Sequence, residues 1–78
     1  MQNKKPQELP KWFTAEAYKH GGEVINPYTG DSVELTAAEL SMYDLIKGAE
    51  MFRDYTTLEK GLNWFRRENP TAYMVLLD

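Results

Sequence analysis

The chain contains no cysteine and only one histidine among its 78 residues. Without cysteine there can be no disulfide framework, no thiolate nucleophile and no thiolate zinc site. The single imidazole, His20, stands beside Gly21 and Gly22, where a helix end or the surface is its expected place. Because a nucleophile, a base and an orienting group cannot be assembled from these residues, we expect no catalytic activity.

Long apolar runs are also missing. The longest, residues 73–77, is far shorter than the roughly 20 residues that a transmembrane helix needs. The first six residues are polar and no apolar segment follows them, so a secretory signal peptide is not expected. The sequence therefore predicts a cytoplasmic protein with no membrane partner.

Positive charge is scarce. Nine Lys and Arg residues stand against twelve Asp and Glu residues, and residues 23–59 carry eight of these acids with only Lys47 and Arg53. Binding to nucleic acid usually requires a clearly basic patch, so nucleic acid is not expected as the main partner.

The glycines and carboxylates lack the spacing of a ligand site. No phosphate-loop or dinucleotide pattern is present, and the segment around Asp31 lacks the Gly and Glu positions of an EF-hand loop. The pair of Glu34 and Glu39 resembles ordinary surface charge. We expect no cofactor and no metal.

Apolar residues are plentiful. They make up 42% of the chain and aromatic residues 13%, which is enough to fold one small domain. Residues 1–11, which include Pro6 and Pro10, resemble an N-terminal arm. Residues 12–78 are predicted to form a single α+β domain, mostly helical, with one β-hairpin packed on the helices.

The hairpin is predicted from residues 23–25 and 32–35, joined by the turn-forming residues 26–31. One face of Val24, Ile25, Val33 and Leu35 should be buried. Before the hairpin, Thr14 is a candidate N-cap for a short helix over residues 15–20 that Gly21 would close.

A longer helix is predicted from Ala37 to about Asp54. Thr36 and Glu39 have capping-box spacing, and Leu35 and Leu40 occupy the positions of a hydrophobic staple. Its core stripe recurs in steps of four and three and consists of Ala38, Met42, Leu45, Ala49 and Phe52.

The opposite side of this helix is also apolar, because Leu40, Tyr43 and Met51 lie there. The hairpin could cover this side. Alternatively, it is exposed and binds another protein or a second copy of the chain. Both alternatives stay open at the level of sequence.

Another capping box, Thr56 with Glu59, predicts a helix that runs to about Glu68. Leu58, Leu62 and Phe65 would form its buried stripe, and Gly61 beside them would allow another backbone to approach closely. Asn69 and Pro70 then predict a break and a new helix to Leu77, with a strand as the competing reading.

Trp64 lies away from the buried stripe of this helix, on the side of Lys60 and Arg67. The N-terminal arm with Trp12 and Phe13 could cover it. Trp and Arg also dominate many binding interfaces, so Trp64 is a candidate anchor for a protein partner. An indole beside basic side chains could equally stack on single-stranded nucleic acid.

Three segments, residues 22–30, 43–50 and 64–78, resemble small uncharacterised proteins of marine tailed phages. The resemblance implies expression in the cytoplasm of an infected bacterium and no known activity. No site residue can be transferred from it.

The sequence thus favours a small protein-binding accessory or regulatory module, with self-association as one form of binding. Its candidate residues are Leu40, Tyr43, Met51, Lys60, Trp64 and Arg67. The alternative is a nucleic-acid-associated accessory protein that uses Lys60, Trp64 and Arg67.

Overall fold

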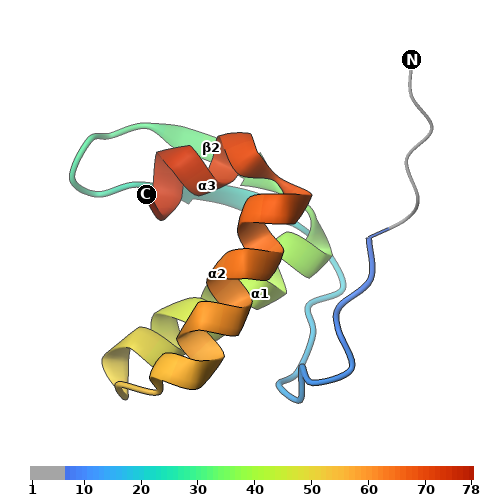
Figure 1. The fold of residues 1–78 in the computed structure, drawn as a ribbon. Coiled ribbons are helices and arrows are strands. Elements are labelled where there is room, and N and C mark those ends of the chain that lie inside the picture. The colour runs from blue at the N-terminus through green and yellow to red at the C-terminus, as the bar shows by residue number, and fades with distance from the viewer. Residues whose placement is uncertain (1–6) are drawn as a thin grey trace.

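The computed structural model describes residues 7–78 (Figure 1). Its elements in chain order are β1 (Gly22–Ile25), β2 (Ser32–Leu35), α1 (Ala37–Met51), α2 (Tyr55–Glu68) and α3 (Pro70–Leu76). The two strands form one antiparallel sheet that packs on the helices. The predicted α+β class is confirmed.

The hairpin matches the predicted strands and begins one residue earlier, with Gly22 opposite Leu35 and Val24 opposite Val33. Its loop closes where the Asn26 N–H donates to the Asp31 carbonyl at 2.8 Å. Leu35 is buried, but Ile25 is 56% exposed. The expectation that Ile25 lies in the core is wrong, because alternate residues of a strand point to opposite faces.

The capping box at the start of α1 is confirmed. The Glu39 N–H donates to Thr36 Oγ1 at 3.1 Å, and the Thr36 N–H donates to Glu39 Oε1 at 3.0 Å. Backbone N–H groups at the start of a helix have no acceptor within the helix. The capping box therefore supplies acceptors for both N–H groups at the point where the chain passes from β2 into α1.

Helix α1 ends three residues earlier than expected. Phe52 caps it, and Arg53 takes a left-handed conformation with φ of 60°. Phe52 therefore leaves the helix and is 80% exposed, which corrects its assignment to the core. Ile46, at 1% exposure, lies in the core with Met42 and Ala49.

Helix α2 begins at Tyr55, and its N-cap is Asp54 rather than the predicted Thr56. The Asp54 side chain accepts a hydrogen bond from the Thr57 N–H at 3.2 Å. A close approach occurs at Gly61, but it involves a side chain and not the expected backbone, because a Cβ there would lie 2.7 Å from Ile46 Cγ1. Gly61 thus lets α2 pack tightly across α1.

The break between α2 and α3 is also confirmed. The Asn69 side chain accepts from the Ala72 N–H at 3.0 Å, and Pro70 occupies the first turn. The C-terminal segment is therefore a helix and not a strand. It packs on β2, and the Asn26 side chain donates to the Val75 carbonyl at 2.8 Å to hold the hairpin against it.

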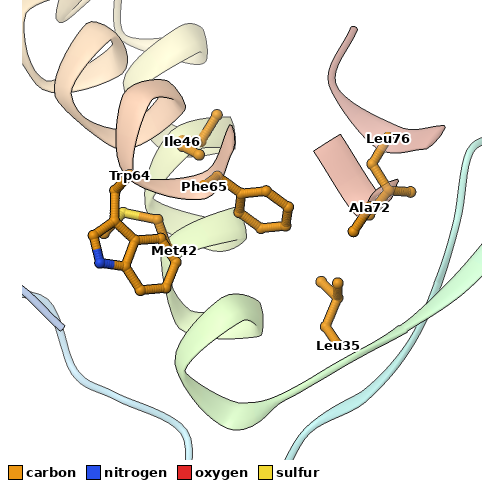
Figure 2. Close-up of a cluster of buried hydrophobic side chains, with 7 residues drawn as sticks. All are labelled: Leu35, Met42, Ile46, Trp64, Phe65, Ala72 and Leu76. Atoms are coloured by element: carbon orange, nitrogen blue, oxygen red, sulfur yellow. The ribbon is translucent and has the colours of Figure 1, made fainter. Parts of the chain in front are cut away.

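The core lies where α1, α2, α3 and β2 meet (Figure 2). Trp64 and Phe65 pack edge to face with ring centroids 6.3 Å apart. The buried apolar cluster consists of Leu35, Met42, Ile46, Trp64, Phe65, Ala72 and Leu76.

Residues 7–20, here called the strap, form no helix and run beside the helices (Figure 1). The short helix predicted over residues 15–20 is wrong. Every residue from 14 to 20 is exposed, so no apolar face exists to offset the cost of helix nucleation. Of the predicted N-terminal arm, residues 1–6 lie outside the described residues, and Leu9 packs on the core.

Candidate interaction surface

The predicted surface of Leu40, Tyr43 and Met51 does not form one exposed face in the structure. Leu40 and Tyr43 are half-buried and pack against the core cluster, whereas Met51 is 75% exposed at the end of α1. Lys47 lies over the Tyr43 ring, with Nζ 5.8 Å from the ring centroid. Of these three residues, Met51 alone is mostly exposed.

In the predicted surface of Lys60, Trp64 and Arg67, the aromatic residue is buried in the core. Trp64 is 4% exposed, and its Nε1–H donates to the Glu8 carbonyl of the strap at 3.3 Å. Lys60 lies 5.6 Å from the ring centroid of Trp12, another strap residue, while Arg67 is exposed. Trp64 is therefore a core residue that the N-terminal arm covers, as one of the two sequence-based readings expected, and its assignment as a surface anchor is wrong.

An exposed apolar cluster lies instead at the junction of α1 and α2. Met51 is 75% exposed, Phe52 80% and Tyr55 65%. These three residues are here called the α1–α2 corner. Helix α1 ends at Met51, and Asp54 is the N-cap of α2, so the chain turns between these two residues. The large side chains at this turn are exposed to solvent.

Beside this corner a groove of about 760 Å³ runs between the strap and α1, and it is here called the strap groove. Its apolar lining includes Leu45, Ala49 and Phe52, so it is continuous with the α1–α2 corner. The strap residues 15–19 form one wall, and Asp54 and Thr57 close the end at α2.

Tyr18 holds the strap wall to α1. Its N–H donates to Ser41 Oγ at 2.8 Å, and Ser41 in turn donates to the Ala37 carbonyl at 2.8 Å. The Tyr18 hydroxyl donates to the Asp44 carboxylate. This hydrogen bond, together with the negative charge of Asp44, raises the pKa of Tyr18 above its usual value.

The groove is rimmed mainly by acids. Glu16, Asp44 and Asp54 line it together with a single basic residue, Lys19. Hydrogen bonds from the side chain and backbone of Thr57 hold the pKa of Asp54 below its usual value, which favours the charged carboxylate. The rim therefore favours a cationic ligand.

The carboxylates of Glu34 and Glu39, which the sequence predicts to be surface charge, lie in different environments. Glu39 is 3% exposed and accepts hydrogen bonds from Gln7, Thr36 and Asn69, whereas Glu34 is exposed on β2. Across residues 7–78, no cluster of His, Asp and Glu has the arrangement of a metal site.

Sequence reasoning assigned Phe52 to the core and passed over Tyr55. Asp54 is the signal that could have located them. Asp is a preferred N-cap residue, and its side chain can accept a hydrogen bond from the backbone N–H three residues later, here that of Thr57. If Asp54 is the N-cap of the second helix, then α1 must end before Asp54, and Phe52 lies in the turn between the two helices. The groove itself had no local signal, because its two walls are distant in sequence.

No protein-family model matches this chain, and no curated protein or solved structure matches it at a significant level. Within the described residues, none of the helices is both long and apolar enough to cross a bilayer.

Proposed function

We propose that this chain is a small accessory or regulatory module that binds a protein and has no catalytic activity of its own. The observation that supports the proposal is the α1–α2 corner, where Met51, Phe52 and Tyr55 expose large apolar side chains within five consecutive residues. Clustered exposed apolar residues on a small domain often mark an interaction site.

The composition of the corner also fits a binding role. Tyr and other aromatic side chains contribute large contact areas and are enriched at protein interfaces, and Met adapts its shape to a partner. The corner borders the strap groove through Phe52, so a partner could contact both. Self-association through the corner is a second form of the same function.

The nucleic-acid alternative receives no such support. It requires an exposed Trp64 on which a base could stack, and Trp64 is buried in the core. Lys60, the basic residue expected beside it, lies over Trp12.

The test is affinity capture of the tagged chain from lysate of its native host, with and without nuclease, followed by mass spectrometry. The variant Phe52→Ser/Tyr55→Ser should lose a partner that the wild-type chain retains after nuclease. Tyr28→Ser is the matched control, since Tyr28 is 94% exposed on the hairpin loop.

Three outcomes would contradict the proposal. The partner could persist on the corner variant, it could vanish with nuclease, or the chain could come down alone and be monomeric by light scattering. Thermal unfolding of both variants should stay near that of the wild type, because the substituted side chains are exposed.

A further inference from the structure

We propose that the strap groove binds an extended segment of a partner protein in which an apolar side chain is flanked by Lys or Arg. This inference rests on the proposed function and names the chemistry of its partner. It is carried by the apolar floor of the groove, by the acids on its rim and by its exposed strap wall, which has no regular secondary structure.

The floor is built to receive a side chain. Gly48 lines the groove in the last turn of α1, and a Cβ placed on it would meet nothing within 4 Å. Leu45 and Ala49 lie on the same helix and supply apolar contacts. Space above a helical glycine, next to apolar neighbours, suits an apolar group inserted from outside.

The rim selects the charge of the partner. Glu16, Asp44 and Asp54 surround the floor, with Lys19 as the basic lining residue. Among residues 7–78 the salt bridge joins Lys47 and Glu50, so none of these rim acids forms a salt bridge with a Lys or Arg of the described chain. Basic side chains next to the inserted apolar group would complement them.

The wall favours an extended segment over a small apolar molecule. Residues 15–19 are all exposed and have no regular secondary structure. Among residues 7–78, the backbone of this wall is hydrogen-bonded at the Tyr18 N–H, which donates to Ser41 Oγ. An exposed wall without regular secondary structure suits the backbone of an extended chain, as in strand addition.

The experiment is a selection of random short peptides displayed on filamentous phage against the purified full chain. We expect the enriched peptides to combine Lys or Arg with a neighbouring Leu, Ile or Phe. A synthetic peptide of the enriched sequence should bind less tightly as salt rises, because its ion pairs lie at an exposed rim.

Two variants of the protein, each with a matched control, then locate the bound peptide. Gly48→Phe fills the groove and should abolish binding, while Gly48→Ala, which adds one methyl group to an open helical position, should keep the affinity within about threefold. Glu16→Lys should weaken binding about tenfold at low salt, whereas Glu34→Lys on the exposed face of β2 should not.

The inference is overturned if no peptide is enriched, if the enriched peptides are acidic or uncharged, or if Gly48→Phe and Glu16→Lys leave binding unchanged. Its failure is distinguishable from failure of the proposed function. A natural partner that depends on Phe52 and Tyr55 but not on Gly48 or Glu16 would keep the protein-binding function and reject the groove as its peptide site.

Discussion

Glu39 shows how a single residue joins three parts of the molecule. Its Oε1 accepts from the Thr36 N–H at 3.0 Å and from Asn69 Nδ2 at 3.1 Å, and its Oε2 accepts from Gln7 Nε2 at 2.7 Å. The carboxylate is therefore buried with its hydrogen bonds satisfied. It links the strap, the start of α1 and the junction of α2 with α3.

Substituting Glu39 should therefore be costly. Glu39→Ala leaves three donors without their acceptor, and we expect a loss of about 1–3 kcal/mol in the free energy of unfolding. Glu34→Ala removes an exposed carboxylate from β2 and should change stability by less than about 0.5 kcal/mol. Urea unfolding at neutral pH measures both, and equal effects would contradict the structural role of Glu39.

The capping role of Glu39 was predictable, but its burial was not. The spacing of Thr36 and Glu39 specifies a local hydrogen bond within one helical turn. The partners that bury it, Gln7 and Asn69, lie 32 and 30 residues away in sequence. A local pattern contains no information about such distant partners, so the same carboxylate was interpreted as surface charge.

Among the helices, α2 has a different N-cap residue from the one that the sequence predicts. Thr56 with Glu59 has capping-box spacing, yet Asp54 caps the helix. Asp and Thr are both good N-caps, and the turn after α1 decides between them because the Asp54 N–H bonds the Ala49 carbonyl at 2.9 Å. This contact also explains why α1 is shorter than its apolar pattern suggests.

The Asp54 cap predicts a pH dependence of stability. Thr57 lowers the pKa of Asp54 in the folded state, so the folded protein binds fewer protons at this group than the unfolded chain. The stabilising contribution is complete above the unfolded pKa of about 3.9 and is lost as pH falls through the lower folded pKa.

Urea unfolding of the wild type and Asp54→Asn across the acidic range tests this expectation. The advantage of the wild type should shrink as pH falls below about 4, because the protonated carboxyl loses its charge. Thr57→Val removes the hydroxyl donor and keeps the backbone N–H, so it should reduce the advantage without abolishing it. A difference between wild type and Asp54→Asn that does not vary with pH would refute this account.

For the molecule as a whole, the strap decides what is buried. It covers Trp64 through the Glu8 carbonyl, places Trp12 under Lys60, and forms one wall of the groove through Tyr18. The strap contains no helix or strand, so its position depends on contacts with the rest of the chain. It is thus part of the domain as well as part of the candidate site.

Tryptophan fluorescence measures this arrangement. In Trp12→Phe the emission comes from Trp64, which is 4% exposed, and it should be blue-shifted and weakly quenched by acrylamide. In Trp64→Phe the half-buried Trp12 should emit further to the red and be quenched more readily. A red-shifted, strongly quenched Trp64 in a folded Trp12→Phe variant would show that the strap does not cover the core.

The type and order of the main elements were predictable, whereas the candidate site was not. Periodicity, caps and turn residues located the hairpin and the helices from residue 22 onward. The groove arises only because residues 15–19 lie against α1, and the exposure of Phe52 depends on where two helices meet. Both are tertiary properties, and of the predicted site residues only Met51 lies in the α1–α2 corner.

The strap contacts also bear on how the protein is made. Glu8 meets Trp64 across 56 residues of sequence, and Asn26 meets Val75 across 49. A ribosome releases the N-terminal segment first, so the strap and the hairpin must wait for partners that are synthesised many residues later. The native core therefore cannot close before α2 and α3 have left the ribosome, and a nascent chain stalled before α2 would expose its apolar residues to chaperones.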